Sequence, residues 1–485
     1  MQPLDHDIII VGAGIAGISA SYHLLKHNPN LNILILESRN NLGGTWDLYR
    51  YPGVRCDSDM FTYGFDFHPW TKKNTFASGE EIRNYLNETV KKFDLLKLMK
   101  FGRLLEEADW SSKEACWTLK IKQSDRKKTK YLTCRHMLMC TGYFSYQQGY
   151  IADLPGIERF KGTIIDPQHW PDNLNLDECN LAIVGSGATA ISVAPALAQI
   201  AKSVTMIQRT PSYIYAKPDV GFFSDLLYRL LPARLFFQLK RFQSVFVHTW
   251  FVNFSRYFPA WSKHWFLNYL KKQFANTVTD TSEIAPPYFP WQQRVCITPN
   301  GEFFDSVTRG DLRIETKHII KIDEQGLELQ SGCFIPANVI VMATGFELEV
   351  YGGVLISVDG QLKTLSDAVT YKGAMLSDIP NFIYFSGYSK LSWTIRVGLV
   401  AKFSCRLLAY MTKHNYSVCT PRLSDNNEMT LTRLNKNFMP GYLQRKAHLF
   451  PQSGDLFPWK APDSFHQDVR DLLKKPIKER HLSFD

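Results

Sequence analysis

The sequence predicts an α/β fold that contains two dinucleotide-binding units, with the second unit inserted into the first, and an additional helical subdomain. Three observations support this prediction. An apolar strand is followed by a glycine-rich turn twice in the chain, at residues 7–17 and 180–190. Two later apolar strands each end in Thr-Gly-aromatic, at residues 137–143 and 339–346. A strongly aromatic and basic stretch, residues 221–278, interrupts the second unit and is expected to be helical.

Length and composition indicate a globular chain of two or three domains. The chain has 485 residues, of which 45% are hydrophobic and 21% charged, so it can bury a large core. An Ile-rich strand is predicted from Asp7, so no targeting peptide is expected upstream. Nine cysteines without a C-x-x-C pair indicate a reduced, cytoplasmic protein without a disulfide framework or metal site. The net charge of +10 is typical of a basic enzyme or of a protein with an anionic partner such as a membrane surface, and no nucleic-acid partner is expected.

The first glycine-rich turn has the features of a Rossmann-like unit. Gly12 permits the tight turn, Gly14 lets the backbone approach a pyrophosphate, and Gly17 lets the helix pack closely on the strand. The next strand ends at Glu37, twenty residues after Gly17. An acidic residue at that place accepts hydrogen bonds from a ribose.

The second turn repeats the pattern with Gly185, Gly187 and Ala190, and its next strand ends in Arg209 instead of an acid. An arginine there suits the 2′-phosphate of NADP and disfavours NAD. The alternative is an arginine at a solvated strand end. An acidic first unit and a basic second unit together predict FAD in the first and NADPH in the second.

The two Thr-Gly-aromatic segments are expected to carry the chain between the units. We therefore divide the chain into these parts: the first part of the FAD-binding domain, 1–145; a linker, 146–171; the NADPH-binding domain, 172–212 and 279–342; a helical insertion, 213–278; and the return to the FAD-binding domain with a C-terminal tail, 343–485.

Several motifs resemble those of the class B flavin-dependent monooxygenases, in the flavin-containing monooxygenase superfamily, and most closely the Baeyer–Villiger monooxygenases. They are the two glycine-rich turns, NLGGTW (41–46), YPGVRCDSD (51–59), QRTPSY (208–213) and PWQQR (290–294). The resemblance covers nearly the whole chain. It implies that one oxygen atom from O2 is inserted into a small lipophilic ketone through a C4a-peroxyflavin, to give an ester or lactone. It also implies cofactor contacts from Gly44, Thr45, Trp46, Asp57, Tyr63, Thr210 and Thr394.

The resemblance assigns Arg294 as the catalytic arginine and Asp57 as the carboxylate that holds it. A peroxide anion and a tetrahedral oxyanion both need fixed positive charge in a dry pocket, and a buried guanidinium needs a carboxylate partner. The alternative is structural: PWQQR is an ordinary loop, and Asp57 caps the next helix. Gln293 stands where some relatives have a phosphate-binding Lys, so Arg209 and Thr210 are left as the main determinants for NADPH.

The linker stretch 160–171 has too many turn-forming residues to be a strand or a helix. The family fingerprint F-x-G-x-x-x-H-x-x-x-W-P is matched by Phe160, Gly162, Trp170 and Pro171, but Asp166 replaces the histidine. Either His169 takes over its place, or Asp166 accepts hydrogen bonds from linker amides. The replacement leaves two possibilities, retained function or impaired oxygenation. Further along, Gly398 stands near the place of an acidic residue in relatives, and Arg396 is expected at the surface.

The segment 221–275 contains one acidic residue, Asp225, and eight basic residues. Its longest uncharged run has fourteen residues, Phe242–Ser255, and a bilayer span needs about 20. Two compatible interpretations are helices that cover the substrate pocket and a peripheral contact with a membrane.

Three other functions share parts of this pattern. An oxygenase of sulfides or amines shares every cofactor motif, and the Arg294–Asp57 pair is what favours a ketone. A disulfide reductase is excluded because the YPGVRC segment has one cysteine and no redox pair. An uncoupled NADPH oxidase-like flavoprotein is the third alternative, supported by Asp166 and Gly398.

Overall fold

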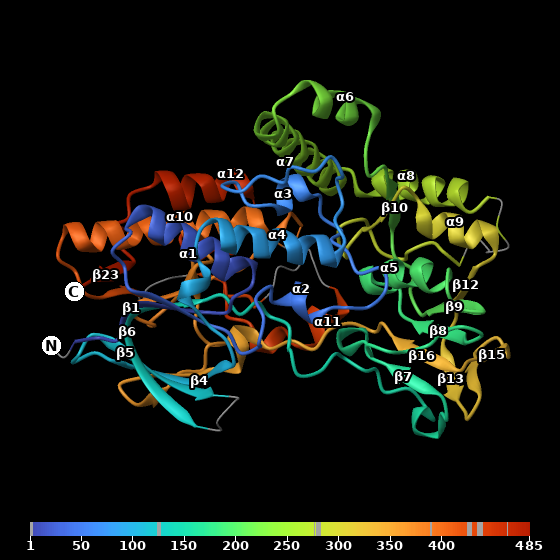
Figure 1. Cartoon of the computed structure of the whole chain (residues 1–485), viewed down its shortest axis with the longest axis horizontal. Helices are drawn as coiled ribbons and strands as arrows, with labels where there is room; N and C mark the ends of the chain where they lie inside the picture. The colour runs from blue at the N-terminus through green and yellow to red at the C-terminus, as the bar shows by residue number, and fades with distance from the viewer. Residues whose placement is uncertain are drawn as a thin grey trace.

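The computed structural model is an α/β structure built on two separate sheets, one at each end of its long axis (Figure 1). The structure describes residues 3–123, 128–275, 277, 283–388, 390–423, 429–433, 440–462 and 464–485. We call the part built on the first sheet the first unit and the part built on the second sheet the second unit. The predicted boundary at 278/279 lies outside the described residues.

The first sheet has nine strands in the order β18-β17-β4-β5-β6-β1-β2-β3, with β21 also paired to β6. Its centre is parallel, because β1 pairs in parallel with both β2 and β6. The strands are β1 (His6–Val11), β2 (Ile33–Leu36), β3 (Met99–Lys100), β4 (Arg103–Ser111), β5 (Cys116–Gln123), β6 (Thr129–Met139), β17 (Leu355–Val358), β18 (Gln361–Leu362) and β21 (Phe382–Tyr384).

The second sheet is entirely parallel, in the order β12-β9-β8-β16-β7. Its strands are β7 (Thr163–Ile165), β8 (Asn180–Val184), β9 (Ser203–Gln208), β12 (Leu312–Thr316) and β16 (Val339–Met342). All of them lie in the sequence between β6 and β17 of the first sheet. The predicted α/β fold class, with one unit inserted into the other, is therefore confirmed.

The chain crosses between the units twice, and the two crossings lie side by side. Phe144 and Leu348 form an antiparallel bridge. The backbone N–H of Ser145 donates to the carbonyl of Glu347 at 2.9 Å, and that of Glu349 donates to the carbonyl of Tyr143 at 3.0 Å. The Thr-Gly-aromatic segments thus form one two-stranded connection.

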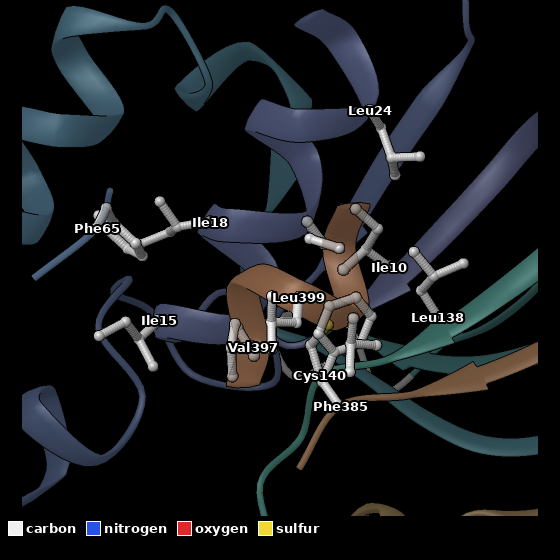
Figure 2. Packing of buried hydrophobic residues seen from close by; sticks show 14 of the residues in the cluster. Ile10, Ile15, Ile18, Leu24, Phe65, Leu138, Cys140, Phe385, Val397 and Leu399 are labelled. Atoms are coloured by element: carbon white, nitrogen blue, oxygen red, sulfur yellow. The ribbon is translucent and has the colours of Figure 1, made fainter. Parts of the chain in front are cut away.

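The core of the first unit lies between the first sheet and two helices, α1 (Ile15–His27) and α10 (Trp393–Lys413). Ile10 and Leu138 of the sheet, Leu24 of α1 and Leu399 of α10 belong to one buried cluster, in which Ile18 of α1 lies beside Phe65 (Figure 2). Residues from the two ends of the sequence therefore form one buried cluster, which fixes the N-termini of α1 and α10.

One sequence prediction about the linker is wrong. Residues Thr163–Ile165 form β7, the edge strand of the second sheet, in register with Val339–Val341. Three consecutive β-branched residues favour a strand, and an edge position needs hydrogen bonds on one side only. The linker stretch is thus attached to the second unit over these three residues.

The helical insertion leaves the second unit between two short parallel strands, β10 (Ile214–Lys217) and β11 (Cys296–Pro299). Its helices, α6 (Phe222–Leu230), α7 (Ala233–Tyr257) and α8 (Pro259–Gln273), lie at the top of Figure 1. Phe236 and Phe237 of α7 join the core of the first unit, and Phe266 of α8 joins that of the second. Among the described residues, no helix has both the length and the apolar composition of a membrane-spanning helix.

The remaining elements complete the two units. The helices are α2 (Thr45–Leu48), α3 (Met60–Tyr63), α4 (Gly79–Lys92), α5 (Ala188–Leu197), α9 (Glu302–Arg309), α11 (Gly441–Arg445) and α12 (Phe465–Asp468). The short strands are β13 (Ile319–Ile322), β14 (Gly326–Leu329) and β15 (Phe334–Pro336), followed by the pairs β19 (Thr370–Tyr371) with β20 (Met375–Leu376) and β22 (Cys419–Pro421) with β23 (Leu482–Phe484).

Candidate functional site

The first glycine-rich turn joins β1 to α1 and leaves no room for side chains. Gly12 has φ +106°, and a Cβ there would lie 2.6 Å from the carbonyl oxygen of Cys140. A Cβ on Gly17 would lie 2.0 Å from the carbonyl oxygen of Gly12. Both glycines are therefore required sterically, and the amino end of α1 is left open toward the turn.

Glu37 closes the same turn from the end of β2. Its Oε2 accepts the backbone N–H of Ala13 at 2.8 Å, and its Oε1 accepts that of Arg39 at 2.9 Å. The side chain is buried, and burial raises the pKa of the carboxyl group. Glu37 thus lies beside the turn and holds the backbone of Ala13 and Arg39.

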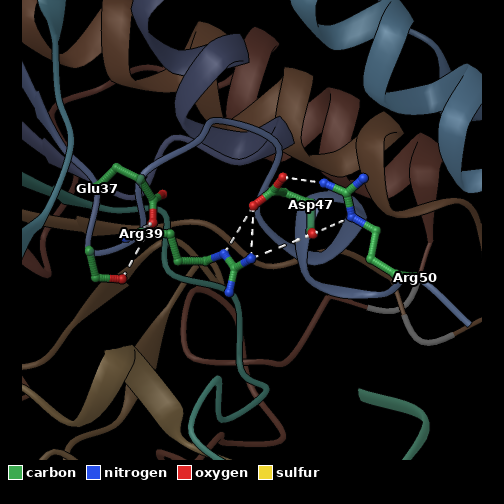
Figure 3. Close-up of polar contacts among 5 residues, drawn as sticks. Glu37, Arg39, Asp47 and Arg50 are labelled. Atoms are coloured by element: carbon green, nitrogen blue, oxygen red, sulfur yellow. Dashed lines mark hydrogen bonds and ion pairs between the residues drawn. The ribbon is translucent and has the colours of Figure 1, made fainter. Parts of the chain in front are cut away.

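A buried carboxylate that the sequence did not reveal holds the neighbouring segment (Figure 3). Asp47 of α2 pairs with Arg39, Oδ2 to Nη2 at 2.8 Å, and with Arg50, Oδ1 to Nη2 at 2.7 Å. Arg39 also donates its backbone N–H to Glu37. A buried carboxylate is stabilised by such charge-assisted bonds, so Asp47 fixes the NLGGTW segment against the end of β2.

The NLGGTW segment brings Gly44 next to the turn, and its Thr45 and Trp46 begin α2. Gly44 has φ +56°, and a Cβ there would lie 3.1 Å from the Cα of Gly14. The indole Nε1 of Trp46 donates to the hydroxyl of Tyr63 at 2.7 Å. Gly44 therefore lies against Gly14 of the turn, and Trp46 is held by Tyr63 of α3.

Arg294 and Asp57 form an ion pair between the two units. Nη1 of Arg294 lies 2.6 Å from Oδ2 of Asp57. The arginine side chain is 46% exposed and the aspartate 22%, and the charge of Asp57 raises the pKa of Arg294. The residue that caps α3 is Asp59, whose carboxylate accepts the N–H of Thr62, so the capping alternative for Asp57 is excluded.

A second ion pair joins the same loop to the second unit. Nη1 of Arg55 pairs with Oε1 of Glu302 in α9. Arg55 is largely buried, and burial lowers its pKa to about 10. The YPGVRCDSD loop is thus held to the second unit at two points.

Two tyrosines lie near Arg294. Tyr143 and Tyr442 interact electrostatically with the guanidinium group of Arg294. The ring centroids of Tyr143 and Trp393 lie 5.3 Å apart. Burial raises the pKa of both phenols, so they stay protonated at neutral pH. Tyr442, which no motif indicated, comes from α11 near the end of the chain.

The amino end of α10 contributes two buried hydroxyl groups. Ser392 and Thr394 are buried, and neither hydroxyl has a hydrogen-bond partner within the described part of the chain. A buried unpaired hydroxyl is costly, so both groups fit the site of a bound molecule with polar atoms.

The prediction that Arg396 faces the surface is wrong. Arg396 is fully buried, and its Nε pairs with Oδ2 of Asp468 at 2.9 Å. It also donates to the carbonyl oxygens of Ser386 and Lys372, both at 3.0 Å. Arg396 is a structural residue that ties α10 to the C-terminal segment.

The second glycine-rich turn joins β8 to α5. A Cβ on Gly185 would lie 2.1 Å from the carbonyl oxygen of Ala343, whereas a Cβ on Gly187 would meet no heavy atom within 4 Å. Ala190 is fully buried, as helix packing requires. Arg209 is exposed at the end of β9, and the hydroxyl of Ser186 in the turn donates to the carbonyl of Thr210 at 2.7 Å.

Asp166 organises the linker. Its carboxylate accepts the backbone N–H groups of Gly149 at 2.8 Å and Gln168 at 2.9 Å, and it lies 3.1 Å from Nδ1 of His169. The geometry matches the alternative in which Asp166 accepts linker amides. His169 is exposed and contacts Asp166.

The fingerprint residues around Asp166 have structural contacts. A Cβ on Gly162 would lie 2.2 Å from the carbonyl oxygen of Asn338. Phe160 and Trp170 pack against two different clusters of the second unit. Buried Gln168, outside the fingerprint, donates to the carbonyl of Ser145 at 2.7 Å and so ties the linker to the crossings.

A family model described as flavin-binding monooxygenase-like matches residues 5–269. The chain belongs to this family. The chain is 38% identical over 480 residues to the FAD-containing monooxygenase EthA of Mycobacterium tuberculosis. This alignment covers 99% of this chain and 97% of the relative. It is also 38% identical to the probable FAD-binding monooxygenase AlmA of Acinetobacter baylyi, over 99% and 96% of the two chains. Membership confirms the predicted enzyme class, a flavin monooxygenase.

Solved structures of flavin monooxygenases share the fold. A steroid monooxygenase bound to NADP matches with a TM-score of 0.70 and 20% identity, over 86% of this chain and 88% of that one. OTEMO in complex with FAD and NADP matches with a TM-score of 0.69 and 20% identity, over 87% and 88%. The family likeness and the two-sheet architecture thus agree.

Proposed function

We propose that this flavin monooxygenase inserts one oxygen atom from O2 into a ketone and produces an ester or a lactone. The ion pair between Arg294 and Asp57 is the observation that carries the proposal. Oxygen insertion next to a carbonyl places negative charge on oxygen atoms, and fixed positive charge in a site that excludes water stabilises it. Arginine remains charged when partly buried, and Asp57 reinforces that charge.

We assign the two cofactor sites from the same geometry. The turn that Gly12, Gly14 and Gly17 form would receive the pyrophosphate of FAD at the amino end of α1, with Glu37 at its ribose. Gly44, Thr45, Trp46, Tyr63 and Thr394 would contact the rest of the flavin nucleotide. Gly185, Gly187 and Ala190 would form the NADPH turn, with Arg209 and Thr210 at the 2′-phosphate. When bound, the flavin reduced by NADPH supplies the activated oxygen.

The chain's own residues would then position charge and exclude water. One guanidinium nitrogen of Arg294 is held by Asp57, so the remaining N–H groups are oriented without losing their donor capacity. Tyr143 and Tyr442 stay neutral and can donate hydrogen bonds beside it. Trp393 and the neighbouring aromatic rings would limit access of water.

We further propose that the substrate is a small lipophilic ketone. The aromatic rings around Arg294 favour an apolar molecule. A lipophilic substrate also suits the predicted membrane contact of residues 221–275, because such a molecule partitions into a bilayer.

The reaction is tested by comparing Arg294→Ala and Arg294→Lys with the wild type, in holoenzyme with measured FAD content. Ester formation from a small lipophilic methyl ketone and sulfoxide formation from an aryl methyl sulfide are quantified separately. We expect Arg294→Ala to lower ester formation by about 10²–10³-fold, and Arg294→Lys to recover part of it. Arg309→Ala, which breaks an exposed pair with Asp311, is the control.

Three outcomes would contradict the proposal. Ketone turnover by Arg294→Ala at the wild-type rate removes this arginine from the reaction. Sulfoxide as the sole product of the wild type identifies an S-oxygenase. Release of one H2O2 for each NADPH with both substrates identifies an uncoupled oxidase.

A further inference from the structure

Helix α7 has apolar residues on two opposite faces. Its inner face packs on the first unit, where Phe236 and Phe237 are buried and Arg241 donates to the carbonyls of Phe61 and Gly64. Its outer face carries large apolar side chains at intervals of three and four residues, which place them on one side of a helix. These exposed residues are Leu235, Leu239, Phe242, Phe246 and Trp250.

The elements on either side of α7 in the sequence also carry exposed apolar residues. In α6, Phe222 is 81% exposed and Phe223 77%, and Leu226, Leu227 and Leu230 are exposed beside them. Tyr257, Phe258 and Trp261 extend the surface at the junction with α8. Figure 1 shows α6 and α7 at the outer edge of the molecule. We call these exposed residues of α6, α7 and the junction the outer apolar surface.

Many exposed large apolar side chains on neighbouring elements of a folded chain mark an interaction site. The charges around it identify the occupant. Arg229, Arg234 and Arg256 are exposed in α6 and α7, whereas Arg241 lies on the inner face of α7. The one acidic residue of 221–275, Asp225, is paired with both Lys73 at 3.3 Å and Arg229 at 2.6 Å. Exposed Arg229 and Arg234 flank the ends of α6 and α7.

We propose that the outer apolar surface docks on an anionic lipid bilayer, with α6 and α7 lying in the interface. Exposed Phe, Trp and Leu side chains between basic residues are the composition of interfacial helices, and each basic residue near an anionic surface adds to the attraction. A second copy of the chain would bring the same basic residues against each other, which opposes dimerisation through this face.

The docking helix is connected to the candidate site. On the inner side of α7, Nε2 of His248 donates to the carbonyl oxygen of Lys390 at 2.6 Å, two residues before Ser392. The His248 ring also lies 5.3 Å from that of Trp291, in the loop that carries Arg294. A lipid-soluble substrate would thus leave the bilayer close to the loops of the site. The docking itself does not depend on which reaction the enzyme catalyses.

Vesicle binding of the FAD-loaded enzyme tests the proposal without turnover. Co-sedimentation is measured with vesicles of phosphatidylcholine alone and with vesicles that also contain phosphatidylglycerol. We expect binding to the anionic vesicles and weaker binding at high salt. Phe242→Ser and Phe246→Ser should each lower the partition coefficient roughly tenfold, and Arg234→Ala roughly fivefold. Insertion should also shift Trp250 fluorescence to shorter wavelength, a change that Trp250→Phe removes.

Matched controls separate docking from general stickiness. Leu362→Ser replaces an exposed leucine of β18, and Lys113→Ala an exposed base between β4 and β5; both variants should bind as the wild type does. All replaced residues are exposed, so FAD content should not change. No binding of the wild type to either vesicle, or equal losses in the controls, would overturn the proposal. A dimer in sedimentation velocity that Phe242→Ser abolishes, without vesicle binding, would assign the surface to a second copy.

Discussion

The carboxylate of Asp166 accepts the backbone N–H of Gly149 at 2.8 Å, across seventeen residues of sequence. The same side chain caps the following turn through the N–H of Gln168. Asp166 therefore closes a loop between the first crossing and β7, and the residue that departs from the family fingerprint has a structural role of its own.

Removing that carboxylate should destabilise the linker. We expect Asp166→Ala to cost about 0.5–2 kcal/mol of unfolding free energy, the usual effect of a lost capping side chain, measured by urea unfolding. Asp166→His restores the fingerprint but also removes the carboxylate acceptors, so it should not exceed the wild type in stability. His169→Ala removes an exposed contact and should change little. A larger loss in His169→Ala than in Asp166→Ala would disprove this assignment.

Arg209→Ala should weaken NADPH binding selectively. The 2′-phosphate would lose a charge-assisted hydrogen bond, worth about 1.5–3 kcal/mol, whereas NADH has no such phosphate. Dissociation constants for both nucleotides are compared by titration. Lys202 lies just before the start of β9, at the opposite end of the strand from Arg209. The variant Lys202→Ala therefore serves as the control. Equal losses for NADPH and NADH would refute the assignment.

Asp468→Ala should be among the most destabilising single substitutions. It leaves the guanidinium of Arg396 buried without its carboxylate, a situation that costs about 3–5 kcal/mol. The double variant Arg396→Met/Asp468→Leu should be more stable than Asp468→Ala alone. Glu324→Ala, which breaks an exposed pair with Lys161, should change stability by less than about 1 kcal/mol. The check is urea unfolding of all four proteins.

Stability should fall on mild acidification because of His136. This residue of β6 is buried, and burial lowers its pKa to about 3. Below about pH 6.5 the imidazole of His136 is protonated in the unfolded chain but stays neutral in the folded chain. The free energy of unfolding is therefore at its full value above that pH and decreases below it. The expected loss is about 2 kcal/mol at about pH 5. His136→Leu should flatten the acid limb of the profile, and His27→Leu, at the exposed end of α1, should not.

The parts of the fold that are local in sequence could be predicted from it. The turns at Gly12 and Gly185 each lie between a strand and a helix that follow directly, and steric rules for glycine apply to them. The sequence did not predict strand β7, because three residues that stand among turn-forming residues are too few to show the alternating pattern of a strand. Its stability comes from pairing with β16, more than 170 residues later.

Contacts between distant residues could not be predicted in the same way. Arg396 was placed at the surface because its partner, Asp468, lies seventy-two residues away. Arg294 and Asp57 are separated by 237 residues, and only the family resemblance brought them together. Asp47 and Tyr442 gave no signal, because a buried carboxylate or phenol has no spacing rule of its own.

The paired crossings between the units have a mechanical consequence. Two segments joined by backbone hydrogen bonds cannot be stretched independently, since lengthening one would shear it past the other. Their bridge at Phe144 and Leu348 therefore resists pulling the units apart, while a two-stranded ribbon twists readily about its long axis. Relative motion of the units should be a torsion about this ribbon, with the glycines at 142 and 345 as its two pivots.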